Sequence, residues 1–292
     1  MSVKIMIDSA SDINEVEAKE LGFLFIPIQV MLEDEEYLDG VNLLPETFFD
    51  KLPNCKTLPR TSLINSFRWD DEFEKATKDG DDVVVITLSS KISGTYEAAV
   101  KSAEKFDGKI QVVDSLNAAL GERLLGLYAL ELAKQKLSAK EIADKLNEQK
   151  NNVRIFAVID TLEYLKKGGR ISATTAFFGK MPAIKPVIGV INGKVEVIGS
   201  AKGNKKGNLY LNSTVEESGK INFDMPFGLL YSGNDKTNIE KYKISCAYLF
   251  EGRTPDTYPM GCTIGTHVGP GAVGIAYFLN KTKMTDPSLN YQ

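Results

Sequence analysis

The chain has 292 residues, of which 43% are hydrophobic and 25% are charged, enough apolar material for one large domain or two medium ones. Its 35 Lys and Arg against 39 Asp and Glu give a net charge of −4, which argues against a protein devoted to nucleic acid. With one histidine and three scattered cysteines, a zinc site built from several imidazoles and a disulfide framework are both excluded. No apolar run is long enough to span a membrane, and the start of the chain lacks the apolar core of a signal peptide. We therefore expect a cytoplasmic protein without membrane insertion.

The first half of the chain alternates short β-branched runs with amphipathic stretches, which is typical of βαβ units and a parallel sheet. The expected strands cover residues 3–7, 23–32, 83–88, 109–113 and 154–159, and the last of them closes this half. The expected helices cover residues 14–21, 45–52, 66–78, 93–106 and 117–136, and a further helix is capped by Ser138 with Glu141.

The second half has a different pattern, with a hairpin turned by Asn192-Gly193, helices near 205–218 and 234–242, and short strands over 228–231 and 263–266. The predicted fold is α/β with two lobes. An N-terminal parallel-sheet domain covers residues 1–160, and a C-terminal mixed α/β domain covers 161–292. No low-complexity linker separates the lobes, so we expect them to pack closely with the ligand between them.

A hydroxyl-rich turn leads from the strand over 83–88 into the next helix and carries Ser93 and Gly94. Free N–H groups at a helix start favour an anion, and a glycine there lets a ligand approach the backbone. The pattern equally fits a serine that only caps its own helix.

Three other segments carry candidate side chains. Thr61 and Ser62 lie in an extended or turn segment, Arg170 follows the turn Gly168-Gly169, and His267 lies in a glycine-rich turn between a short strand and a helix. Arginine suits a carboxylate or phosphate, and histidine suits a proton carrier or hydrogen-bond donor. Each also has a plain structural explanation: a helix cap, a solvated arginine and a structural histidine.

Two more segments contain charged residues whose function the sequence leaves open. Asp12 precedes the helix over 14–21, and we expect it to cap that helix rather than bind a metal. The basic stretch over 202–206 is either a solvated helix start or a docking patch for an acidic or phosphate-bearing partner.

These motifs occur in one order, and through them the chain resembles the DegV family of bacterial fatty-acid-binding proteins. The matching stretches are 8–12, 61–62, 88–95, 160–172 and 265–272. The resemblance implies a two-domain fold with a long-chain fatty acid in a buried tunnel, its carboxylate held by Thr61 and Ser93, and Arg170 and His267 beside the head group. It also implies a lipid-carrying subunit that depends on a separate ATP-binding fatty acid kinase subunit, whose acyl phosphate product feeds phospholipid synthesis.

The expected ligand-binding set is therefore Thr61, Ser62, Ser93, Gly94, Arg170 and His267, with no catalytic residue, no metal and no cofactor. Arg170 and a protonated His267 would stabilise charge around the transferred phosphoryl group. Tunnel-lining candidates, for which ordinary core is the alternative, are Phe177, Phe178, Met181 and Ile184. The chain departs from the family at Leu63-Ile64 and at Asn204 in the basic stretch. A lipid sensor or storage protein and a Ser93 hydrolase remain the alternative functions.

Overall fold

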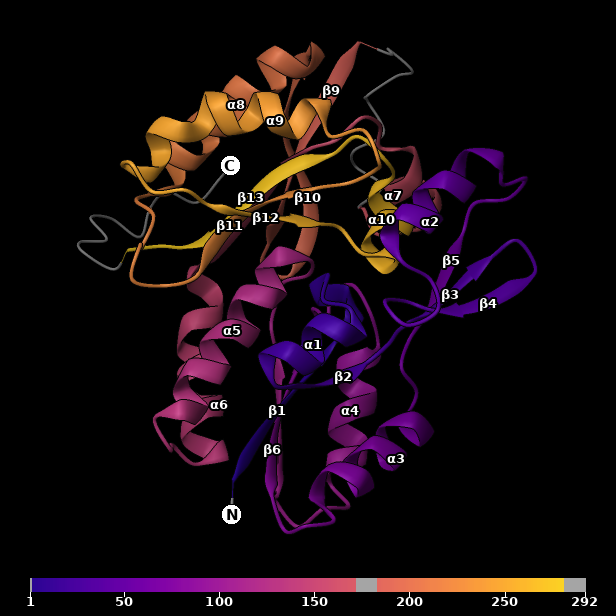
Figure 1. Ribbon diagram of the computed structural model, residues 1–292, viewed down its shortest axis with the longest axis vertical. Helices are drawn as coiled ribbons and strands as arrows, with labels where there is room; N and C mark the ends of the chain where they lie inside the picture. The colour runs from indigo at the N-terminus through magenta and orange to yellow at the C-terminus, as the bar shows by residue number, and fades with distance from the viewer. Residues whose placement is uncertain (1, 172–182, 281–292) are drawn as a thin grey trace.

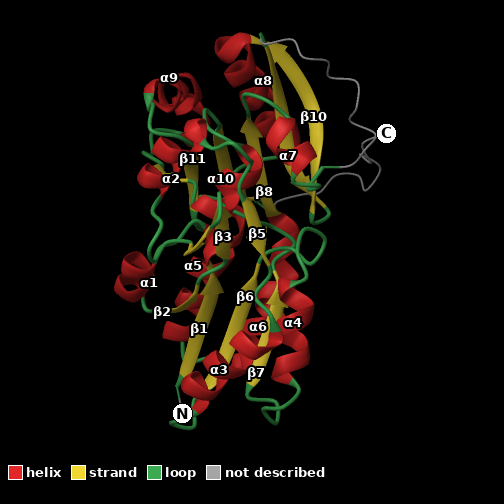
Figure 2. Cartoon of the chain, turned by 90° about the vertical axis from the view of Figure 1, so that its right-hand side faces the viewer, coloured by secondary structure: helices red, strands yellow, loops and turns green. Residues whose placement is uncertain are grey.

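The computed structural model describes residues 2–171 and 183–280, which form two α/β lobes stacked along the long axis of the molecule (Figure 1). The chain begins in the lobe with the parallel sheet, and the other lobe carries a larger mixed sheet (Figure 2). The predicted two-lobed α/β architecture is confirmed. The candidates Phe177, Phe178 and Met181 lie outside the described residues.

A four-stranded, fully parallel sheet in the order β2-β1-β6-β7 forms the first lobe. Its strands are β1 (Val3–Asp8), β2 (Phe23–Ile26), β6 (Asp82–Thr87) and β7 (Ile110–Asp114). The continuous apolar run of β6 is buried because helices cover both faces of the sheet. The helices of this lobe are α1 (Glu15–Leu21), α3 (Ser66–Thr77), α4 (Thr95–Ala103), α5 (Leu120–Lys134) and α6 (Ala139–Gln149).

The second lobe is built on a mixed six-stranded sheet in the order β10-β9-β8-β13-β11-β12. Its strands are β8 (Val153–Val158), β9 (Ile184–Ile191), β10 (Lys194–Lys202), β11 (Phe227–Tyr231), β12 (Asp256–Pro259) and β13 (Val273–Phe278). Its helices are α7 (Glu163–Lys167), α8 (Gly203–Ser218), α9 (Thr237–Cys246) and α10 (Cys262–Val268). Helices α8 and α9 cover the outer face of this sheet (Figure 1).

A small antiparallel sheet in the order β4-β3-β5 lies beside the junction of the two lobes. It consists of β3 (Gln29–Leu32), β4 (Glu35–Leu38) and β5 (Arg60–Ser62), with α2 (Pro45–Lys51) packed against it. Four single turns of 3-10 helix complete the described elements: η1 (Ser9–Ser11), η2 (Leu52–Asn54), η3 (Lys150–Asn152) and η5 (Ala247–Phe250).

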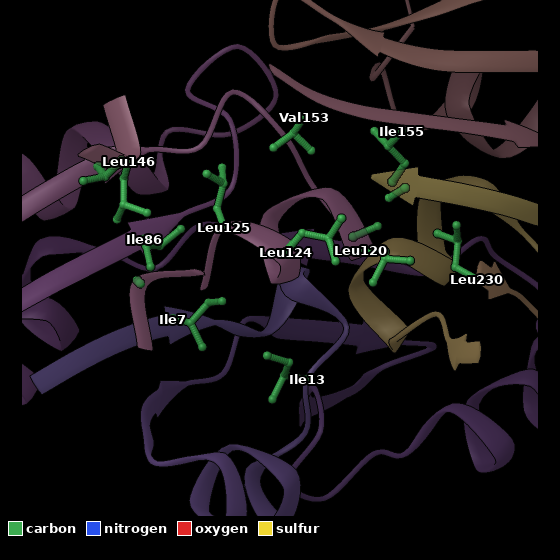
Figure 3. Close-up of a cluster of buried hydrophobic side chains, with 14 of the residues drawn as sticks. Ile7, Ile13, Ile86, Leu120, Leu124, Leu125, Leu146, Val153, Ile155 and Leu230 are labelled. Carbon is green, nitrogen blue, oxygen red and sulfur yellow. The ribbon is translucent and has the colours of Figure 1, made fainter. Parts of the chain in front are cut away.

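Helix α5 joins the cores of the two lobes. Its buried leucines Leu120, Leu124 and Leu125 contact one apolar cluster that includes Ile7 of the parallel sheet and Ile155 of the six-stranded sheet (Figure 3). Burial of a leucine side chain contributes about 1.5–3 kcal/mol, so this shared cluster supplies much of the free energy that holds the lobes together.

Two local predictions are confirmed in detail. Ser138 accepts the N–H of Glu141, and the Glu141 carboxylate accepts the N–H of Ser138, which completes a capping box at the start of α6. At the hairpin between β9 and β10, Asn192 and Gly193 have φ of 49° and 82°. A two-residue turn with positive φ at both positions matches the twist of the paired strands.

The expected single strand over 23–32 is wrong, because it is divided into β2 and β3, which belong to different sheets. Pro27 lies at the break and has no N–H to continue the ladder. The placement of the strand over 154–159 in the first half is also wrong, since β8 pairs with β9 and β13. The sheets therefore divide before Val153, whereas the domain boundary at Asp160 stays a prediction.

The expected strand over 263–266 is wrong as well, because these residues belong to helix α10. The helix expected after His267 is the strand β13, and β4 and β12 were not predicted. The start of α10 is stabilised by the carboxylate of Asp39, far away in the sequence, so no local sequence pattern predicts this helix.

Asp12 does not cap α1, contrary to the prediction. Asn14 occupies the N-cap position and accepts the N–H of Glu17 at 2.9 Å. Asp12 instead has a left-handed backbone, with φ of 62°, and its Oδ1 accepts the N–H of Gly261 at 2.8 Å. It therefore links the first lobe to the second.

Glu122, in the first turn of α5, is fully buried, and neither carboxylate oxygen has a hydrogen-bond partner among the residues that the structure describes. Burial raises its pKa well above the ordinary value, and the nearby carboxylates of Asp8, Asp12 and Asp114 raise it further. The folded protein consequently retains a proton that the unfolded chain releases above pH about 4.5.

We expect Glu122→Gln to stabilise the protein at pH 7.5. The raised pKa makes the wild type lose stability as the pH rises above about 4.5, and glutamine has no proton to lose, so the gain should be about 1–3 kcal/mol. Chemical denaturation at pH 7.5 and pH 4.5 measures it, and the difference should shrink at the lower pH. Glu131→Gln, on the exposed side of the same helix, is the control. A Glu122→Gln protein no more stable than wild type at pH 7.5 would contradict this account.

Candidate functional site

A cavity of about 320 Å³ lies where the carboxyl ends of the parallel strands meet the six-stranded sheet. Its walls come from both lobes: Leu88 and Ala119 follow the parallel strands and their loops, whereas Ile155, Ile188 and Leu230 project from β8, β9 and β11. Most of the lining is apolar. The predicted position between the lobes, at the ends of the parallel strands, agrees with this cavity.

The six predicted ligand-binding residues all line this one cavity: Thr61, Ser62, Ser93, Gly94, Arg170 and His267. They come from strand β5, the loop before α4, the turn after α7 and the last turn of α10. The fold thus gathers polar groups from four separate segments at a cavity that is otherwise largely apolar.

Thr61 and His267 are in direct contact. The Thr61 Oγ1 lies 2.9 Å from the Nε2 of His267, although the two residues are 206 positions apart. Thr61 is positioned by strand β5, where it pairs with Val30 of β3. His267 is positioned by the seven-residue helix α10.

The N-terminus of helix α10 is stabilised by the carboxylate of Asp39, which lies outside the helix. The side chain of Asp39 accepts the N–H of Cys262 through Oδ1 and the N–H of Thr263 through Oδ2, both at 2.9 Å. With the bond from Gly261 to Asp12, these carboxylates satisfy the N–H groups at the helix start, which otherwise have no backbone partner. Asp39 therefore fixes the helix that carries His267.

Ser93 lies next to the N-cap of α4, which confirms its predicted place at or near the helix start, although α4 begins at Thr95 with Gly94 as N-cap, two residues later than expected. Its Oγ accepts the N–H of Thr95 at 3.3 Å and lies 3.0 Å from Thr95 Oγ1. Ser93 thus helps to cap α4 while it also lines the cavity, so the two explanations of this residue are compatible.

The environment of His267 favours the neutral imidazole. Burial, together with the nearby charge of Arg170, lowers its pKa to about 4. Its Nδ1 has no hydrogen-bond partner in the described part of the chain. In the ligand-free protein at neutral pH the imidazole is therefore neutral, and a protonated His267 beside a transferred phosphoryl group stays a prediction.

Arg170 is turned back toward the cavity by the two glycines before it. Gly169 has φ of 68°, and Arg170 Nη1 donates a hydrogen bond to the carbonyl of Gly168 at 2.6 Å. A Cβ at Gly168 would lie 2.4 Å from the Nδ1 of His267, so only glycine leaves room for the ring. The predicted sharp turn is confirmed, and the two glycines also end α7, with Gly168 as its C-cap. The role of the guanidinium stays a prediction.

The apolar wall includes residues that no motif singled out, such as Phe156, Gly189 and Met260. Phe156 and Gly189 lie in the mainly apolar strands β8 and β9, and Met260 follows β12, so the sequence does not distinguish these cavity walls from ordinary core. Ile184, a tunnel candidate at the start of β9, is not among the described residues that line the cavity.

The described residues 2–171 and 183–280 contain neither a metal-binding cluster nor a membrane-spanning helix. No group of three or more His, Cys, Asp and Glu side chains there is arranged to hold a metal ion. No helix in the same ranges has both the length and the hydropathy to cross a membrane.

Comparison with known proteins gives a consistent match. The family model of the uncharacterised DegV proteins matches residues 2–280. A DegV domain-containing protein of Caldanaerobacter subterraneus is 30% identical over 276 residues, covering 94% of this chain and 98% of that protein. A fatty-acid-binding DegV family protein from Thermus thermophilus has a TM-score of 0.84 at 28% identity, covering 96% of this chain and 100% of that one. DegV of Bacillus subtilis, a fatty acid binding protein, has a TM-score of 0.81 at 26% identity with coverages of 96% and 100%.

We expect Asp39→Asn to destabilise the protein by about 1–3 kcal/mol, because the amide places an NH₂ group against one of the two N–H donors and leaves that donor unsatisfied. Urea denaturation measures the change. Asp34→Asn, five positions away and exposed, should stay within about 0.5 kcal/mol of wild type. Equal stability of the two variants would show that Asp39 does not hold α10.

Proposed function

The chain belongs to the DegV family, and we propose that its cavity binds a long-chain fatty acid whose carboxylate is held by Ser93 and Thr61. The observation that carries this proposal is the composition of the cavity, in which apolar walls from both lobes meet one set of polar side chains. Solved relatives that bind fatty acids support the same ligand class.

The apolar walls suit the tail of the ligand. Each buried methylene contributes about 0.8 kcal/mol, so a long chain provides ample binding energy without specific contacts. Ile155, Ile188 and Leu230 come from three strands of one sheet and would contact successive segments of the tail.

The polar residues suit the head group. A buried carboxylate is costly unless it receives hydrogen bonds, and the hydroxyls of Thr61 and Ser93, the ring of His267 and the guanidinium of Arg170 can all donate. In the ligand-free protein the Thr61 hydroxyl contacts His267 and the Ser93 hydroxyl contacts Thr95, so these groups are held in place before a ligand arrives.

The carrier would present the carboxylate to a separate ATP-binding kinase subunit in the cytoplasm. One carboxylate oxygen attacks the γ-phosphorus of ATP, the bond from that phosphorus to the bridging oxygen breaks, and ADP leaves while the acyl phosphate stays on the carrier. The turn over 88–95 lacks the glycine and lysine spacing of a phosphate loop, which is consistent with a nucleotide held elsewhere.

A stand-alone hydrolase that uses Ser93 has weaker support. Such a nucleophile needs an adjacent base, and the hydrogen bonds of Ser93 go to Thr95, while the Nε2 of His267 faces Thr61. A lipid sensor or storage protein would share the cavity and differ only in lacking the kinase partner.

Native mass spectrometry of the purified protein tests the ligand. We expect a co-purifying or added long-chain fatty acid to bind, and Thr61→Val to weaken palmitate binding about tenfold or more, because a hydrogen bond to a charged group is lost. Thr57→Val, on an exposed residue nearby, is the control. Absence of any fatty acid binding by wild type would overturn the proposal. Phosphorylation of the bound acid by ATP and a kinase subunit would separate a carrier from a sensor.

Fatty acid binding should be coupled to proton uptake by His267. A carboxylate beside His267 raises its pKa from about 4, so the complex binds a proton that the free protein does not. Affinity should therefore increase as the pH falls from 7.5 to 6. Titration calorimetry in two buffers with different ionisation enthalpies measures the uptake, which His267→Gln should abolish. Equal uptake in wild type and His267→Gln would rule out the histidine as its source.

A further inference from the structure

A second cavity, of about 190 Å³, adjoins the first. The two cavities share Ile92, Arg170 and Val195, so Arg170 lies at the boundary between them. The remaining described residues that line the smaller cavity are Lys91, Gly169, Ile171, Lys194 and Glu196. A fatty acid whose carboxylate is held by Thr61 and Ser93 leaves this smaller cavity without a function.

Hydrogen bonds fix the backbone on three sides of the smaller cavity. Lys91 lies in the loop before α4, and Lys194 follows the hairpin turn at the start of β10. These two segments are joined by the Ser89 Oγ, which donates to the carbonyl of Gly193 at 2.7 Å. The third segment is joined through a bridge between Ile171 and Val195. The backbone segments that bear Lys91, Arg170 and Lys194 are therefore fixed relative to one another.

The charge around this cavity is unbalanced. Three cations, Lys91, Arg170 and Lys194, face one carboxylate, Glu196. None of the four forms an ion pair within residues 2–171 and 183–280, and Arg170 uses one nitrogen for the carbonyl of Gly168. Positive charge around a small polar space, next to the proposed head-group site, suits an anion larger than a carboxylate.

We propose that the smaller cavity is the subsite for the phosphoryl group of a bound acyl phosphate. This inference rests on the proposed function. An acyl phosphate keeps its tail in the main cavity, and its head group extends beyond the position of the carboxylate by one phosphoryl group with nearly two negative charges. Arg170 reaches both parts of such a head group, and Lys91 and Lys194 supply charge at its outer end.

The subsite distinguishes the phosphorylated ligand from the free acid. A fatty acid carboxylate does not extend into it, so its cations contribute little to fatty acid binding and add directly to acyl phosphate binding. The carrier would therefore retain its phosphorylated ligand until transfer.

The test compares two ligands on the delipidated full chain. Palmitate is the free acid, and the second ligand is a β-ketophosphonate in which a methylene replaces the bridging oxygen of palmitoyl phosphate, so that it resists hydrolysis. Lys91→Gln with Lys194→Gln should weaken phosphonate binding about tenfold and change palmitate binding by less than about twofold. The Glu196→Gln protein should bind the phosphonate more tightly than wild type.

The matched control is Lys78→Gln with Lys101→Gln, which removes the same charge near the ends of α3 and α4 that lie away from the cavity. Equal weakening by the control pair would attribute the effect to overall charge and overturn the subsite. Unchanged phosphonate binding in Lys91→Gln with Lys194→Gln would also overturn it.

Two further comparisons distinguish a failure of the proposed function from a failure of the phosphoryl subsite. If wild type binds neither palmitate nor the phosphonate, the proposed function fails; if it binds palmitate and both double variants bind the phosphonate like wild type, only the subsite fails. Inorganic phosphate added to the palmitate-loaded protein should not bind at concentrations where the phosphonate saturates. Phosphate binding that is lost in Lys91→Gln with Lys194→Gln would assign the cavity to free phosphate and overturn the proposal.

Discussion

Two buried carboxylates, Asp12 and Asp39, receive the backbone N–H groups of Gly261, Cys262 and Thr263 at the start of α10. Both acids belong to the N-terminal part of the chain, and the helix belongs to the C-terminal part. Burial of an acidic side chain is costly and raises the pKa of both groups, and the hydrogen bonds from α10 offset part of that cost. These bonds therefore favour one relative position of the two parts. The contact of His267 with Thr61 depends on that position.

The polar side chains of the cavity already make hydrogen bonds in the ligand-free protein. His267 contacts Thr61, Ser93 contacts Thr95, and Arg170 donates to Gly168. At Thr61 and Ser93 a ligand head group therefore exchanges existing hydrogen bonds, which keeps the net gain from these two hydroxyls modest. The apolar walls then account for most of the affinity, and the polar groups determine which kind of head group is accepted.

Local patterns predicted the elements whose causes are local. The capping box at Ser138 and the hairpin turn at Asn192-Gly193 depend on residues next to each other, and both are present. The start of α10 depends on Asp39, more than two hundred positions away, so its sequence appeared strand-like. Local patterns singled out the six site residues, and the family resemblance favoured ligand binding over a purely structural role for them. The apolar wall was missed because a cavity residue such as Phe156 has the same character as a core residue.

The core shared through α5 means that the lobes are not independent folding units. The helix packs on strands of both sheets, and one apolar cluster contains Ile7, Leu124 and Ile155. A fragment that ended at Asp160 would keep β8 but lose its neighbours β9 and β13, which would expose two unpaired strand edges and one face of α5. The molecule should therefore unfold in a single cooperative transition, and its ligand cavity can exist only while both sheets are folded.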